Sequence, residues 1–88
     1  MKARVNRTNI SEHLVEYQLK MVGKTFSDVE GDEKWYYNNT MTEEQHQEFK
    51  RYAIPLLKKI FKFNKARAEQ TFEWFNMQFG LRIKQEEL

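Results

Sequence analysis

The side chains with the most specific chemistry in this sequence are basic residues spread over residues 51–67, where the stretch KKIFKFNKAR interleaves them with aromatic rings. Cations at such spacing are typical of a surface that neutralises phosphates, and six contacts would make nucleic-acid binding strongly salt-dependent. Lys2, Arg4 and Arg7 would add a basic arm beside the helical domain. One hypothesis is therefore a DNA- or RNA-binding patch made of Arg51, Lys58, Lys59, Lys62, Lys65 and Arg67.

Helix electrostatics offers an alternative reading of the same lysines. The predicted helix over residues 42–63 has glutamates near its start and Lys58, Lys59 and Lys62 near its end. That polarity matches the helix dipole, with each charge contributing about 0.3–1 kcal/mol. We favour this alternative, which assigns the interleaved aromatics to the apolar face. It leaves Lys65 and Arg67 unexplained, because cations in the first turn of the next helix oppose its dipole.

Metal binding and nucleophilic catalysis have little support. His13 and His46 are the only histidines and no cysteine is present, so no thiol nucleophile and no cysteine-based metal site is available. His46 lies near Phe49 and Tyr52 on an apolar stripe and is predicted to be a half-buried packing residue. No glycine-rich phosphate loop and no GxSxG pattern occurs, and Ser11 and Ser27 resemble helix caps.

Carboxylates cluster in one short segment, at Asp28, Glu30, Asp32 and Glu33. Acid–base catalysis would need carboxylates that converge from separate elements in a site that excludes water. The spacing also differs from the twelve-residue ladder of a calcium-binding EF-hand. We therefore expect a solvated surface segment, no enzymatic activity, no metal and no cofactor.

Composition predicts one folded domain. The 88 residues are 40% hydrophobic and 15% aromatic, and each large ring can bury about 150–250 Å². No apolar run approaches the roughly 18 residues of a membrane span, and no apolar region follows the basic N-terminus as in a secretion signal. A cytoplasmic protein without membrane contact is expected. Residues 25–48 carry six net negative charges, whereas residues 49–67 carry seven net positive ones.

The first predicted helix covers residues 10–22, with Asn9 as its N-cap and Gly23 as its end. It shows two apolar strips at helical spacing. The second strip, formed by Val15, Leu19 and Val22, is expected either to be covered by other elements or to face a partner. A short helix is predicted to start at residues 25–28 and to stop at Gly31, before an irregular connection over residues 32–40 whose rings plug the core.

The third helix, over residues 42–63, contains Pro55 on its polar side. We favour one helix kinked at Pro55 over two helices that break near Ile54. The fourth helix starts at Asn64 and ends at Gly80, and its predicted core face consists of Ala68, Phe72, Phe75 and Phe79. Residues 81–83 are expected to form a short extended segment.

These elements predict an all-α fold, a compact single-domain bundle of three to four helices without parallel strands. The expected boundaries are a flexible basic arm over residues 1–8, one helical domain over residues 9–84 and a frayed tail over residues 85–88. Trp74 and Met77 point away from the core face of the fourth helix, and Trp35 and Tyr36 lie in the irregular connection. Such residues at a surface are favoured interface anchors, although a small domain can also use them to fill its core.

Four stretches carry a resemblance: RVNRTNI at 4–10, EYQLKMVGKT at 16–25, MTEEQHQEFKRYAIPLLKK at 41–59 and FEWFNMQFGLRIK at 72–84. Together they resemble small uncharacterised helical proteins encoded by large T4-like tailed bacteriophages. The resemblance implies an infected bacterial cytoplasm and a role in binding host proteins, and it assigns no catalytic residue. The leading expectation is thus a non-enzymatic protein-interaction module that binds a host or viral protein or a second copy of itself. Nucleic-acid binding is the alternative.

Overall fold

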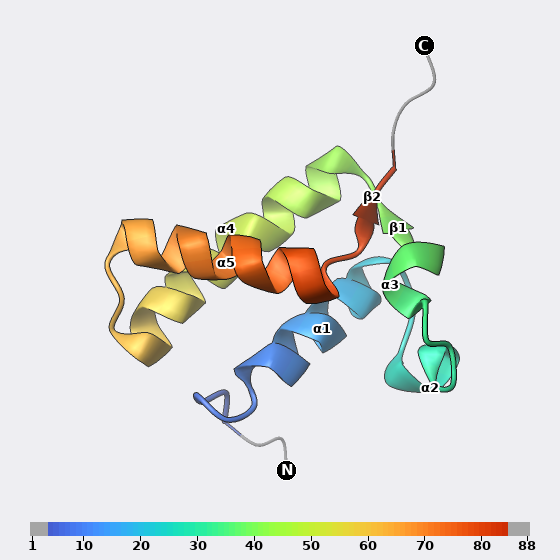
Figure 1. Cartoon of the computed structure of the whole chain (residues 1–88), viewed down its shortest axis with the longest axis horizontal. Coiled ribbons are helices and arrows are strands. Elements are labelled where there is room, and N and C mark those ends of the chain that lie inside the picture. The colour runs from blue at the N-terminus through green and yellow to red at the C-terminus, as the bar shows by residue number, and fades with distance from the viewer. Residues whose placement is uncertain (1–3, 85–88) are drawn as a thin grey trace.

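The computed structural model describes residues 4–84. Its longer helices are α1 (Ile10–Met21), α4 (Glu43–Phe61) and α5 (Lys65–Phe79), and single helical turns form α2 (Phe26–Val29) and α3 (Trp35–Asn38). α4 and α5 form an antiparallel hairpin against which α1 packs, and α2 and α3 lie at the far side from the hairpin turn (Figure 1). The predicted mostly helical fold is confirmed, but the helical turn α3 was not predicted.

Local signals set the ends of α1. At its C-terminus the Lys24 N–H donates to the Leu19 carbonyl at 2.8 Å and the Gly23 N–H donates to the Lys20 carbonyl at 3.1 Å. This is a Schellman motif, and Gly23 takes the positive φ of 75° that it requires. Asn9 occupies the N-cap position, but its side chain makes no cap hydrogen bond to the helix. The predicted capping role of that side chain is therefore wrong.

The side chain of Asn9 holds the preceding turn instead. Its Oδ1 accepts from the Asn6 N–H at 2.8 Å and its Nδ2 donates to the Arg4 carbonyl at 2.8 Å. Val5 packs against the main core. The Asn9 side chain therefore links residues 4–6 of the basic N-terminal segment to the start of α1. Residues 1–3 and the tail 85–88 lie outside the described residues.

α4 is one helix that continues through Pro55, so the alternative of two helices is wrong. Thr42 Oγ1 accepts from the Gln45 N–H at 3.0 Å, and the Gln45 side chain accepts from the Thr42 N–H, which completes the predicted capping box. Pro55 is on the exposed side, as predicted. A bend at Pro55 stays a prediction. The helix ends at Phe61, and Lys62 follows in the left-handed conformation at φ 60°.

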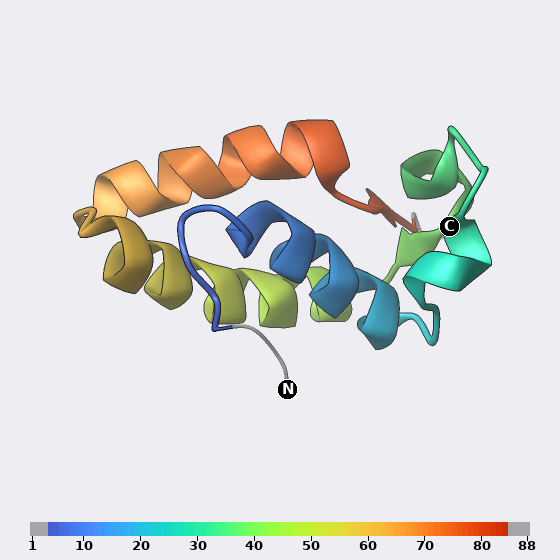
Figure 2. The ribbon, with the colours of Figure 1, turned by 90° about the horizontal axis from the view of Figure 1, so that it is seen from below.

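α5 begins at the predicted cap, where Asn64 Oδ1 accepts from the Arg67 N–H at 2.8 Å. Its buried face consists of Ala68, Phe72 and Phe75, whereas Phe79 is 40% exposed. These residues meet side chains of α1 and α4 in the main core, which contains Ile10, Leu14, Phe49, Ala53, Leu57, Ala68, Phe72 and Phe75. α1 crosses the α4–α5 layer from one side (Figure 2).

The second apolar strip on α1, formed by Val15, Leu19 and Val22, packs in a second and smaller core. Leu19 packs with Met41 and Leu81, and Val15 and Val22 flank this cluster. Met41 lies in β1 (Thr40–Met41), which pairs in parallel with β2 (Arg82–Ile83). The extended segment after α5 was predicted, but the expectation of no parallel strands was wrong. Within the strip, Leu19 is buried by the chain itself, whereas Val15 and Val22 stay half-buried.

Gln18 on α1 anchors the end of α5, where the chain passes from the main core to the second core. It is fully buried at 0% exposure. Its Nε2 donates to the Phe79 carbonyl at 3.0 Å, and its Oε1 accepts from the Leu81 N–H at 3.0 Å. One amide side chain therefore satisfies a donor and an acceptor of the backbone where the chain leaves α5, which places β2 beside β1. No helix in the part of the chain described is long and apolar enough to cross a membrane.

Candidate functional site

The strongest exposed apolar feature is the outer face of α5. Trp74 is 59% exposed and Met77 is 82% exposed, and the two lie one helical turn apart. They project away from the core because α5 buries Ala68, Phe72 and Phe75 on the opposite side. Exposed Gln70 lies one turn before Trp74, exposed Gln78 follows Met77, and exposed Ala66 lies two turns before Trp74. The exposed carboxylate of Glu73 lies at the edge of this surface, one turn before Met77. We call the set of Ala66, Gln70, Trp74, Met77 and Gln78 the outer face of α5.

The other two predicted anchors lie elsewhere. Trp35 and Tyr36 are on α3, with ring centroids 5.8 Å apart in an edge-to-face arrangement. Trp35 is half-buried and packs against the second core, whereas Tyr36 is 41% exposed and Tyr37 56% exposed. The prediction that these rings plug the core holds for Trp35 only. The fold therefore separates the four anchors into a pair on α5 and a pair on α3.

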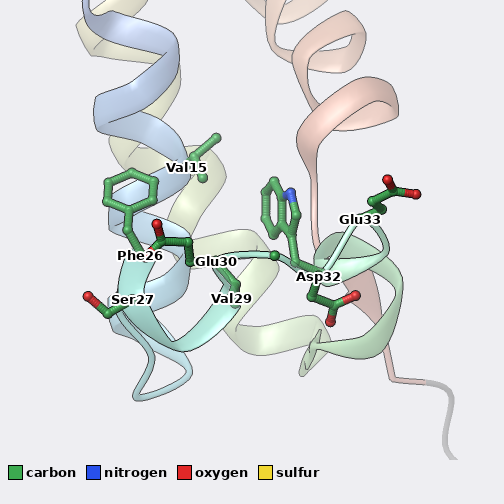
Figure 3. A pocket seen from close by; sticks show the side chains of 9 residues that line it. Val15, Phe26, Ser27, Val29, Glu30, Asp32 and Glu33 are labelled. Atoms are coloured by element: carbon green, nitrogen blue, oxygen red, sulfur yellow. The ribbon is translucent and has the colours of Figure 1, made fainter.

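A recess between α1, α2 and α3 was not predicted. It has a volume of about 700 Å³, and its apolar lining consists of Val15, Phe26, Val29 and Trp35. Figure 3 shows the Phe26 ring at one side of the opening, with Val15 above and the Glu30 side chain beside Phe26. Apart from Val15 on α1, the lining residues come from the continuous stretch 26–35, and the folding of that stretch against α1 forms the recess.

The acidic residues around this recess differ in what they contact. Asp28 Oδ2 accepts from the Thr25 N–H at 2.8 Å, and this backbone hydrogen bond together with the Thr25 hydroxyl lowers the pKa of Asp28. Asp32 accepts from the Lys34 N–H and from Asn38 Nδ2, both at 3.0 Å. These two carboxylates hold turns. Within residues 4–84 no group of three or more metal-ligating side chains comes together.

The predicted basic residues surround the turn between α4 and α5, and two aromatic rings organise them. Phe61 and Phe63 stack with centroids 5.1 Å apart. Arg67 lies over Phe63 at 4.6 Å, and Arg7 lies over Phe61 at 5.8 Å. Arg7 Nε also donates to the Ile60 carbonyl at 3.5 Å. The N-terminal segment and the hairpin turn are thus joined by a stack of arginine, two rings and arginine.

This stack accounts for the position of Arg67 in the first turn of α5, which the helix dipole disfavours. Arg67 gains a cation–π contact, worth about 0.5–1 kcal/mol at an exposed site, which offsets its position at the N-terminus of α5. Lys65 lies 3.9 Å from Glu69, an exposed pair of little energetic value. Among the described residues no carboxylate lies within 4 Å of Lys58, Lys59, Lys62 or Arg67. We call Arg4, Arg7, Lys58, Lys59, Lys62, Lys65 and Arg67 the basic end. Arg51 lies further back along α4.

The histidines serve packing, as predicted for His46. His46 is half-buried with its ring 6.0 Å from that of Phe72, and its Nδ1 is buried without a hydrogen-bond partner among the described residues. Burial lowers the pKa of His46, so the ring is neutral at physiological pH. His13 Nε2 is 2.6 Å from the Tyr52 hydroxyl, and burial raises the pKa of Tyr52. Both contacts lie between helices, His13–Tyr52 between α1 and α4 and His46–Phe72 between α4 and α5.

Comparison with known proteins returned no match to a family model, to a curated protein or to a solved structure. The functional argument therefore rests on the surfaces described above.

Proposed function

We propose that this chain is a non-enzymatic helical protein-interaction module that docks a partner protein on the outer face of α5. The observation that carries the proposal is the exposure of Trp74 and Met77, at 59% and 82%, one helical turn apart on α5. Tryptophan and methionine are enriched at protein interfaces and depleted elsewhere on surfaces, and tryptophan is the residue most often found to dominate binding energy.

The spacing of this face suits a partner helix. Ala66 and Gln70 precede Trp74 at intervals of four residues, and Met77 follows after three. Residues at such intervals form a ridge along a helix, which packs into the groove of a second helix. Under the resemblance to phage proteins, the partner is a protein of the bacterial host or a second copy of the chain.

A pull-down from bacterial lysate treated with nuclease tests this proposal. The variant Trp74→Ala/Met77→Ala is expected to lose the captured partner, because it removes both apolar anchors without touching the core. The matched control is Tyr37→Ala, which removes an aromatic ring of similar exposure from α3 and is expected to retain capture. Equal capture by the double variant and the wild type would refute the proposed surface.

Self-association is tested separately by sedimentation equilibrium of the purified chain. If a second copy is the partner, the wild type sediments as a dimer and Trp74→Ala/Met77→Ala as a monomer. A dimer that persists in the double variant would contradict docking through α5.

Nucleic-acid binding is the second candidate, and the unpaired cations of the basic end favour it. A positively charged turn with aromatic rings is one way to hold a single-stranded backbone. However, Phe61 and Phe63 are half-buried and already covered by Arg67 and Arg7, which leaves few ring faces for bases. This argument ranks nucleic acid second.

Fluorescence anisotropy with a labelled single-stranded oligonucleotide at 20 and 200 mM salt measures this candidate. Binding through phosphates would weaken by at least tenfold at the higher salt concentration and would weaken further in Lys62→Ala/Arg67→Ala. No binding at the lower salt concentration rejects it.

A further inference from the structure

We propose that the recess between α1, α2 and α3 is a binding site for an arginine side chain of a partner polypeptide. This inference is independent of the outer face of α5, because the recess is built from other elements and other residues. Three observations lead to it: two aromatic residues in the lining, one carboxylate without a partner among the described residues, and the contacts that the chain's own arginines make with aromatic rings.

The recess is an open depression with two aromatic residues in its lining. Phe26 and Trp35 both line it, and Val15 and Val29 supply further apolar surface, with Val15 above Phe26 in Figure 3. Its volume of about 700 Å³ falls within the range of about 300–1,000 Å³ that is usual for ligand sites. Phe26 is 37% exposed although it is a large apolar residue on a helix of one turn. An occupant of the recess would remove this apolar surface from water.

The charge of the recess selects a cation. The carboxylate oxygens of Asp28 and Asp32 accept hydrogen bonds within turns. Glu30, in contrast, has no hydrogen bond or ion pair within residues 4–84. In Figure 3 the Glu30 carboxylate lies beside Phe26 at the opening, and Asp32 and Glu33 border the recess. A neutral apolar ligand would leave these charges uncompensated at its edge, and an anion would be repelled.

Arginine fits this combination better than lysine. The planar guanidinium stacks on aromatic faces and donates two parallel hydrogen bonds to one carboxylate, whereas the ammonium of lysine acts as a point charge. The chain uses the same arrangement internally: Arg7, Arg67 and Arg82 lie 5.8, 4.6 and 4.8 Å from the rings of Phe61, Phe63 and Tyr37. Among the described residues, no such cation covers Phe26 or Trp35.

An NMR titration of the full chain tests the proposal, with acetyl-arginine methylamide as the probe. Its matched control is acetyl-citrulline methylamide, which has nearly the same shape without the charge. The expected result is a saturable shift of the Trp35 indole N–H and of the amides of residues 26–35. The Trp74 indole N–H serves as an internal control and is expected to stay in place. Citrulline is expected to bind at least fivefold more weakly.

Variants assign the charge to Glu30. Glu30→Gln keeps the shape of the side chain and is expected to weaken arginine binding at least fivefold, whereas Glu44→Gln, an exposed acid of α4, leaves it unchanged. Both substitutions are on the surface, so folding is retained and the spectrum verifies it. Equal shifts by citrulline and arginine would mean an apolar groove only, and equal shifts by acetyl-lysine methylamide would mean a general cation site. Either result, or a shift that never saturates, overturns the proposal.

Discussion

Gln18 is the one polar residue among those described whose side chain is buried. Because its amide is completely buried, its two hydrogen bonds replace water for the Phe79 carbonyl and the Leu81 N–H. Gln18→Ala would leave both backbone groups buried and unpaired. We expect a loss of about 2–4 kcal/mol in the free energy of unfolding, measured by urea denaturation.

The matched control for this measurement is Gln70→Ala on the exposed side of α5, which should change the free energy of unfolding by less than about 0.5 kcal/mol. A loss below about 1 kcal/mol for Gln18→Ala would mean that water or another group replaces the amide.

Because the pKa of His46 is lowered by burial, we expect the free energy of unfolding to depend on pH. Burial lowers its pKa in the folded state, so the unfolded chain binds the proton more tightly than the folded one. Stability is therefore complete above the unfolded pKa of about 6.5 and falls as the pH drops through that value toward the folded pKa. His46→Gln should show a shallower fall in melting temperature between pH 7 and pH 5 than the wild type.

Gln47→Ala, a neighbouring exposed position that does not titrate, should keep the wild-type slope. Identical slopes for wild type and His46→Gln would show that His46 is not the group responsible.

At the scale of elements, the turn between α4 and α5 contains the only non-glycine residue with positive φ in residues 4–84. Lys62 holds the left-handed conformation, which costs a residue with a side chain about 1 kcal/mol or more relative to glycine. Lys62→Gly should therefore raise the free energy of unfolding by about 0.5–1 kcal/mol, seen as a higher melting temperature.

Lys58→Gly removes the same charge from a helical, exposed position of α4 and should lower the free energy of unfolding by about 1 kcal/mol. Opposite signs for the two substitutions isolate the backbone effect from the loss of charge. The same sign for both would mean that the Lys62 side chain, and not its backbone, determines the stability of the turn.

The elements that sequence analysis predicted well are those set by local chemistry. The Thr42–Gln45 box, the Asn64 cap and the Gly23 stop each act within a few residues, and the structure has each of them. The β1–β2 pair and the Gln18 clamp join residues separated by about 40 to 63 positions, and no local pattern encodes such pairings. The helical turn α3, which carries Trp35 and Tyr36, was not predicted, because one helical turn has too little periodicity to be recognised in the sequence.

The candidate sites also differ in whether local sequence or distant contacts determine them. The outward direction of Trp74 and Met77 follows from helical spacing on α5 alone, and the structure places both outward. The recess at Phe26, Glu30 and Trp35 depends on how α1, α2 and α3 meet, so it needed the structure. The arginine–phenylalanine stack likewise joins Arg7 to residues more than 50 positions away.

At the scale of the whole molecule, the charge blocks of the sequence become opposite sides of the fold. The acidic residues of α2 and of the segment before α3 lie on one side, and the basic turn between α4 and α5 lies on the other (Figure 1). α5 connects the basic turn to the second core, and its outer face with Trp74 and Met77 runs between these two regions. The two strongly charged surfaces are therefore separated by the apolar surface that we assign to partner docking.

The central claim is that Met77 and Trp74 contact a partner in the cell. Site-specific photo-crosslinking tests this most directly, with benzoylphenylalanine introduced in place of Met77 and, as a control, in place of Glu48 on the exposed side of α4. Irradiation of bacterial cells that express each variant is expected to give a discrete crosslinked species at position 77 and none at position 48. No crosslink at either position, or equal crosslinks at both, would contradict the assignment of the outer face of α5 as the docking surface.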